Sequence, residues 1–307
     1  MPFDQYYQDL FAELADVDLN RLDDPGVWPR VIEAVERLPD WECPPVRVED
    51  RVVPGPHGAV PARVYRPPHG SVSGALLWAH GGGFTGGDLD MRESHMVGAE
   101  LAHRSGCAVV SVGYRLASPT VRYPVPVDDV DAAWRWMLGE FGSVDCFLGG
   151  NSAGAALALS VAMRSRSRGL DAAGILLACP LVHFPVPPPV GRLARAIADL
   201  PDPARLPPAY VARIVRDYVG RDTDVPADAM PGGGSMFGLP PVAIVTAEFD
   251  GLRPAAELLV SQLEAAGVPV RTYVAPGMLH GHLNLAPSIP AVGASLDFLA
   301  RALSRGT

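Results

Sequence analysis

Short apolar runs alternate with helical patterns over most of this 307-residue chain, and that alternation constrains its fold more than any other feature. Continuous apolar runs of this kind are typical of parallel strands whose two faces are both covered. Five such runs occupy residues 75–80, 107–114, 145–150, 174–180 and 241–248. Helical patterns lie at 92–104, 127–139, 153–168, 254–266 and 291–303. This βαβ rhythm predicts a doubly wound α/β sheet with helices on both faces.

Three more strand-like runs extend the predicted, mostly parallel sheet to eight strands. The runs at 46–53 and 59–67 alternate valines with charged or small residues, as half-exposed antiparallel strands do, and the last run lies at 270–276. We expect a core formed by residues 46–180 and 240–307.

Two segments do not follow the βαβ rhythm. One is an acidic helical segment at 1–45, and the other is a proline-rich insertion at 181–239 with short helical patterns at 190–200 and 209–220. We expect the two to form a helical cap over the carboxyl edge of the sheet. Surface excursions without a role in the site are the alternative.

Composition excludes several function classes. The formal net charge of −9 argues against nucleic acid as a partner. The four cysteines, Cys43, Cys107, Cys146 and Cys179, are far apart, which argues against a disulfide framework and for reduced thiols in a cytoplasmic protein. The start resembles no signal peptide, and no stretch has the apolar length of a membrane span. The sequence does not fix the oligomeric state, and a homodimer is compatible with it.

A G-x-S-x-G pattern places Ser152 in the short gap between the predicted strand at 145–150 and the helix that follows. Small residues there also suit a close-packed helix start, so the pattern alone does not identify a nucleophile. In a nucleophile elbow, however, small residues at 150, 153 and 154 allow a sharp turn, and the helix dipole favours negative charge on the serine.

Glycines follow the strand predicted at 75–80. Because these glycines carry no side chains, their backbone N–H groups are free to point at a developing oxyanion. The spacing of Gly81, Gly83 and Gly86 also matches a dinucleotide fingerprint. No helix opens at Gly86, and the next strand lacks a terminal acid, so a dinucleotide cofactor is not expected.

Two further strand ends carry titratable side chains. Asp250 follows the strand at 241–248 and could instead cap the next helix, while Glu248 is the competing carboxylate. His280 and His282 follow the last strand, and no further ligand cluster in the sequence supports a metal site there. Ser152, Asp250 and His280 stand in the chain order of α/β-hydrolase triads.

From about residue 45 to its C-terminus, the chain resembles the hormone-sensitive lipase-like esterases, the bacterial family IV carboxylesterases of the α/β-hydrolase superfamily. The resemblance is carried by five motifs: HGGGF at 80–84, YRLA at 114–117, GNSAG at 150–154, EFDGLRP at 248–254 and GMLHGH at 277–282.

The resemblance implies a serine hydrolase that cleaves a small-molecule ester, with a short acyl or acetyl group, and needs neither a metal nor an organic cofactor. Ser152 would be the nucleophile, His280 the general base and acid, and Asp250 the residue that orients it. The implied oxyanion donors are the backbone N–H groups of Gly82, Gly83 and Ala153.

The chain also departs from the family pattern. Asn151 replaces an aspartate, His282 replaces a bulky apolar residue, YRLAPE becomes YRLASP and DPLRDE becomes DGLRPA. The residues expected in the substrate pocket are His80, Phe84, Asn151 and His282. These changes leave open a non-hydrolytic enzyme of the same fold, one that eliminates an acyloxy group or transfers an acyl group in specialised metabolism. A non-catalytic binding protein is less favoured because all three triad residues are present.

Overall fold

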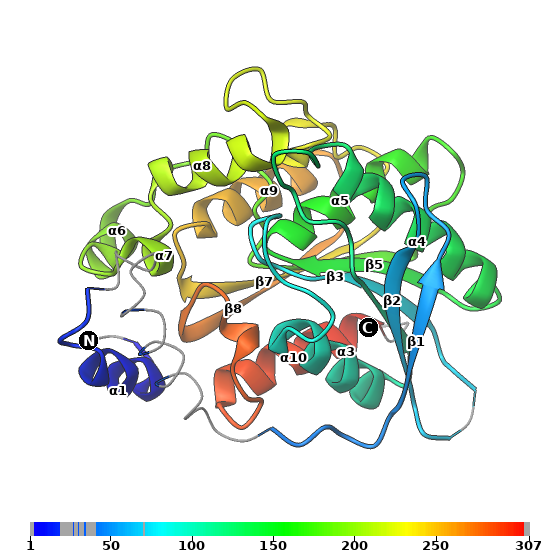
Figure 1. The fold of residues 1–307 in the computed structure, drawn as a ribbon, viewed down its shortest axis with the longest axis horizontal. Helices are drawn as coiled ribbons and strands as arrows, with labels where there is room; N and C mark the ends of the chain where they lie inside the picture. The colour runs from blue at the N-terminus through cyan, green and yellow to red at the C-terminus, as the bar shows by residue number, and fades with distance from the viewer. Residues whose placement is uncertain are drawn as a thin grey trace.

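A computed structural model describes residues 3–18, 27, 30, 34, 41–69 and 71–303 of the chain. Its eight strands form one sheet in the order β1-β2-β4-β3-β5-β6-β7-β8 (Figure 1). The pairs β1–β2 and β2–β4 are antiparallel, and all the other pairs are parallel. The predicted eight-stranded, mostly parallel sheet is therefore confirmed. The strands are β1 (Arg47–Val53), β2 (Val60–Arg66), β3 (Ala75–Ala79), β4 (Ala108–Val112), β5 (Cys146–Asn151), β6 (Gly174–Ala178), β7 (Val242–Phe249) and β8 (Val270–Leu279).

Helices cover both faces of the sheet, because β3 to β6 are buried along their whole length and need apolar cover on each side. On one face lie α3 (Arg92–Ser105) and α10 (Pro290–Leu303). On the other lie α4 (Val125–Phe141), α5 (Ala153–Arg166) and α9 (Arg253–Ala265). These five helices agree with the predicted ones to within about two residues at each end.

The segments outside this core are α1 (Gln5–Glu13), α6 (Gly191–Ile197), α7 (Asp202–Arg205) and α8 (Pro208–Val219). The short α7 was not predicted. In Figure 1, α8 runs along the upper side of the molecule, while α1, α6 and α7 lie at one end. Most of residues 19–40, within the predicted N-terminal segment, lie outside the described residues. No helix among the described residues has the length and apolarity to cross a membrane.

Candidate active site

Ser152 occupies a sharp turn between β5 and α5, with φ 52° and ψ −112°. A non-glycine residue adopts such a conformation only when its surroundings enforce it. The flanking glycines make the turn possible: a Cβ on Gly154 would lie 2.0 Å from the carbonyl oxygen of Ala79, and one on Gly150 would lie 2.5 Å from the backbone of Gly154. The G-x-S-x-G spacing therefore has a steric origin in this chain.

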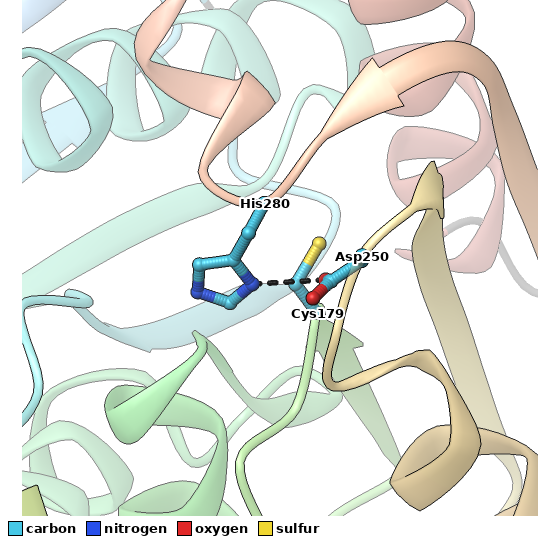
Figure 2. A group of neighbouring side chains, drawn as sticks. All are labelled: Cys179, Asp250 and His280. Atoms are coloured by element: carbon cyan, nitrogen blue, oxygen red, sulfur yellow. Dashed lines mark hydrogen bonds and ion pairs between the residues drawn. The ribbon is translucent and has the colours of Figure 1, made fainter. Parts of the chain in front are cut away.

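His280 follows β8 and lies between Ser152 and Asp250. Its Nε2 is 3.0 Å from the Ser152 hydroxyl, and its Nδ1 is 2.9 Å from Oδ2 of Asp250. Figure 2 shows the second of these contacts. Asp250 is fully buried, so its carboxylate is shielded from water where it meets the imidazole. Three strand ends thus bring the three predicted residues together.

The second oxygen of Asp250 holds a turn. Its Oδ1 accepts a hydrogen bond of 2.7 Å from the N–H of Leu252, an Asx turn directly before α9. The N-cap residue of α9 is Leu252, so Asp250 is not the N-cap itself. The competing carboxylate, Glu248, turns elsewhere and accepts a hydrogen bond of 2.9 Å from the N–H of Gly277.

The glycine loop after β3 and Ser152 line the same cavity, which has a volume of about 430 Å³. Gly82 and Gly83 have φ values of 108° and 61°, which favour glycine, and both line this cavity. Among the described residues, none accepts a hydrogen bond from the N–H of Gly82, Gly83 or Ala153. Three backbone donors are therefore available near the serine.

One long side of the same cavity is formed by α8, through Tyr210, Val211, Arg213, Ile214 and Asp217. Ile214 packs over the glycine loop, since a Cβ on Gly83 would lie 3.5 Å from it. A larger cavity of about 650 Å³ lies at the amino ends of β5 to β8, away from Ser152 and His280. Its lining contains neither a serine nor a histidine, so we place the chemistry in the smaller one.

Of the four residues expected in the substrate pocket, Asn151 lines the cavity and the other three do not. His80, Phe84 and His282 are buried behind it, so that expectation is corrected for these three. Phe84 stacks on Tyr218 with ring centroids 3.9 Å apart.

The two buried histidines have partners in the protein interior. His80 stacks on Tyr114 at 4.3 Å, and its Nδ1 is 2.7 Å from the carbonyl oxygen of Gly81. Nε2 of His282 is 3.0 Å from the hydroxyl of Ser295. Burial lowers the pKa of His80, and it lowers that of His282 to about 4. Both imidazoles are therefore neutral near pH 7.

Cys179 is a neighbour of the site that sequence reasoning missed. It follows β6, is buried, and has one potential ligand atom within 4.8 Å of those of Asp250 and His280 (Figure 2). No local sequence signal could have revealed it, because the proximity of Cys179 depends on β6 and β7 being adjacent in the sheet. Burial and the nearby Asp250 raise the pKa of the thiol well above its ordinary value, and a metal ligand would have to be the thiolate. Asp250 and His280 are also already bonded to each other.

The sheet, the sharp turn at Ser152 and the three convergent strand ends are those of an α/β hydrolase. Residues 76–284 match a family model described as the alpha/beta hydrolase fold. The chain belongs to this family, and its resemblance to the hormone-sensitive lipase-like esterases is confirmed.

Similar proteins include two from Mycobacterium tuberculosis. The esterase LipI is 35% identical, with 85% of this chain and 84% of the relative covered. The carboxylesterase NlhH is 34% identical, with 87% and 86% covered. Among solved structures, a hyperthermophilic esterase from the archaeon Pyrobaculum calidifontis has a TM-score of 0.79 at 30% identity, with 99% of this chain and 98% of that one covered.

Proposed function

We propose that the chain hydrolyses short-chain carboxylic esters through an acyl-serine intermediate on Ser152. The observation that carries the proposal is the continuous hydrogen-bonded path from Ser152 through His280 to Asp250. The esterase relatives support ester hydrolysis. Support for a short acyl group comes from the similarity to an ethyl acetate hydrolase of Pseudomonas putida, which is 30% identical with 80% of this chain and 78% of that protein covered.

In the first half-reaction, Nε2 of His280 takes the proton from the Ser152 hydroxyl as its oxygen attacks the ester carbonyl carbon. The N–H groups of Gly82, Gly83 and Ala153 hold the oxyanion of the tetrahedral intermediate. His280 then gives its proton to the leaving alkoxide, and the alcohol departs.

In the second half-reaction, His280 takes a proton from water as the water oxygen attacks the acyl-serine. The second tetrahedral intermediate collapses, His280 returns the proton to Oγ of Ser152, and the carboxylic acid leaves. Asp250 keeps the Nδ1–H tautomer of His280 and stabilises the imidazolium in both halves.

In this proposal, residues 1–45 and 181–239 form the cap, and α8 supplies the side of the cavity that faces the acyl group. A cytoplasmic location and a homodimeric state also belong to the proposal. The acyloxy elimination and acyl-transfer alternatives depend on an altered pocket, above all on His282. That side chain lies behind the cavity, so hydrolysis is the function we propose.

The test compares Ser152→Ala with Ser160→Ala, because both serines are buried. Ser160 lies within α5, the helix that follows Ser152, and its hydroxyl donates a hydrogen bond to the backbone carbonyl of Ala156. With p-nitrophenyl acetate and butyrate, we expect Ser152→Ala to lower kcat by about 10⁵-fold, while Ser160→Ala stays near wild type. Hydrolysis in ¹⁸O-labelled water should place the label in the released acid. Full activity of Ser152→Ala, or released acid that carries no label, would refute the proposal.

A further inference from the structure

Glu93 is a buried carboxylate beside the site that the mechanism above does not use. It lies in the first turn of α3 and is fully buried. No described arginine or histidine forms an ion pair with it. Acids that are buried without a cation need hydrogen-bond donors instead. The groups that donate hydrogen bonds to Glu93 therefore identify the parts of the site that its carboxylate holds in place.

Both carboxylate oxygens of Glu93 accept hydrogen bonds from the segment that leads into the glycine loop. Oε1 accepts from the indole N–H of Trp78 in β3, at 2.7 Å. Oε2 accepts from the backbone N–H of Gly81, at 2.9 Å. Gly81 directly precedes Gly82 and Gly83. This second hydrogen bond therefore fixes the position of the backbone immediately before the two glycines whose N–H groups are the proposed oxyanion donors.

The nucleophile turn also lies close to Glu93. Burial raises the pKa of Glu93, whereas hydrogen bonds from Gly81, Trp78 and the side chain of Asn151 oppose that rise. Asn151 directly precedes Ser152, and its amide nitrogen lies 3.0 Å from where a Cβ on Gly81 would be. The amide oxygen of Asn151 has no hydrogen-bond partner among the described residues.

The backbone of Glu93 reaches the histidine loop. Its N–H donates to Oδ1 of Asn284 at 3.2 Å, and Nδ2 of Asn284 donates to the carbonyl oxygen of Gly281 at 3.0 Å. Gly281 follows His280 directly. The first turn of α3 is therefore hydrogen-bonded to the glycine loop and, through Asn284, to the histidine loop, and it lies beside the nucleophile turn.

We propose that Glu93 is a positioning residue that orients the oxyanion donors relative to Ser152, with Asn151 as its matched amide donor. The proposal rests on the proposed ester hydrolysis. It also gives a physical reason for Asn151, where the resembling family usually has an aspartate. An ionised aspartate there would place two carboxylates side by side, whereas an amide supplies a donor to the acid.

The main test is Glu93→Gln, which keeps the shape but replaces one acceptor oxygen with an NH₂ group facing existing donors. We expect kcat per active site, titrated with a fluorophosphonate, to fall by about 10- to 100-fold, and KM to change by no more than about twofold. The matched control is Glu100→Gln. Glu100 lies two turns further along α3 and also accepts an indole N–H, that of Trp41, at 2.8 Å. The activity of Glu100→Gln per titrated site should match that of wild type.

A second test exchanges the partners. Asn151→Asp alone should lose activity as pH rises, because the added carboxylate and Glu93 cannot both ionise at low cost. In the double variant Glu93→Gln/Asn151→Asp, the glutamine amide can donate to the new carboxylate. We expect its kcat to exceed the product of the two single effects by about fivefold or more.

Three results would overturn the proposal. The first is a wild-type kcat per titrated site in Glu93→Gln, and the second is a loss of activity in that variant that is explained by its unfolded fraction alone. The third is a double variant whose kcat equals the product of the two single effects. If Glu93→Gln fails to fold, the pH profile of Asn151→Asp decides, and a profile parallel to wild type refutes the pairing. Failure of the proposed function is distinguishable, because wild-type enzyme would then not turn over the esters at all.

Discussion

The floor and the roof of the cavity are held in place by different kinds of contact. The floor consists of Ser152, His280, Asp250 and the glycines 82 and 83. It is fixed by hydrogen bonds between the three polar side chains and, at Gly82, by backbone contacts that leave no room for a methyl group. The roof is α8, which buries Val211, Val215 and Tyr218 against the core and leaves Arg216 in solvent. Apolar contacts are less directional, so the roof should tolerate changes that the floor does not.

The largest difference is expected between two Asp→Asn substitutions. Asp250→Asn in the floor should lower kcat by about 10⁴-fold, because the imidazole loses the acceptor that holds its productive tautomer. Asp217→Asn in the roof changes a residue that lines the cavity and should stay within about twofold of wild type. Steady-state kinetics with p-nitrophenyl butyrate measures both, and equal effects would remove the distinction between floor and roof.

Two Gly→Ala substitutions compare the tight turn that carries Ser152 with an open position in another helix. Gly154→Ala would place a methyl group 2.0 Å from the Ala79 carbonyl oxygen. We expect a loss of about 3 kcal/mol in stability and of at least about 100-fold in kcat as the turn at Ser152 shifts. Gly139 lies within α4 and has nothing within 4 Å of its Cβ position, so Gly139→Ala should stabilise by about 0.5–1 kcal/mol. Chemical unfolding and kcat would be measured on both, and a neutral Gly154→Ala would contradict this account.

His282, behind the floor, gives a pH-dependent prediction. Its folded-state pKa of about 4 lies below the ordinary 6.5, so below pH 6.5 the unfolded chain binds the proton more readily. Stability contributed by the neutral imidazole is thus lost as pH falls, by about 2 kcal/mol between pH 7 and pH 5. The free energy of unfolding of His282→Phe should therefore fall by about 2 kcal/mol less than that of wild type between pH 7 and pH 5. Urea unfolding at the two pH values measures this difference. Parallel losses in the two proteins would refute the assignment.

The smallest effects are expected in the roof. Ile214→Ala should enlarge the cavity over the glycine loop and raise the preference for hexanoate over acetate esters by about three- to tenfold, with little change in kcat for acetate. Arg216→Ala changes a solvent-exposed residue of the same helix that is absent from the cavity lining, and should leave that preference unchanged. A series of p-nitrophenyl esters measures it, and a large fall in kcat with Ile214→Ala would show that α8 also orients the floor.

The sequence predicted the floor well because each of its parts is local. The small residues at 150–154 predict the sharp turn from their own sequence. Asp250 and His280 directly follow strands whose carboxyl ends must lie at the same edge of a parallel sheet. It did not reveal Cys179 or Glu93, whose importance depends on which strands and helices are neighbours. The pocket residues were misplaced for a similar reason: His80, Phe84 and His282 lie next to functional residues in sequence, but their side chains turn into the core.

The roof was predicted only in outline. The pattern at 209–220 matched α8, because its buried residues recur at helical spacing. The side chains it presents to the cavity depend on how the helix lies over the sheet, which no local pattern specifies. The four-residue α7 is too short for periodicity to reveal it.

The two carboxylate oxygens of Asp250 have different partners: Oδ1 accepts from the backbone turn before α9, and Oδ2 contacts His280. An asparagine there could still accept the N–H of Leu252 through its own oxygen and so keep the turn before α9. It would turn an amide toward His280 instead of an acceptor. A single mutational step at this position can therefore yield a folded, inactive protein that keeps its ligand cavity, a short path by which such a chain could become a binding protein.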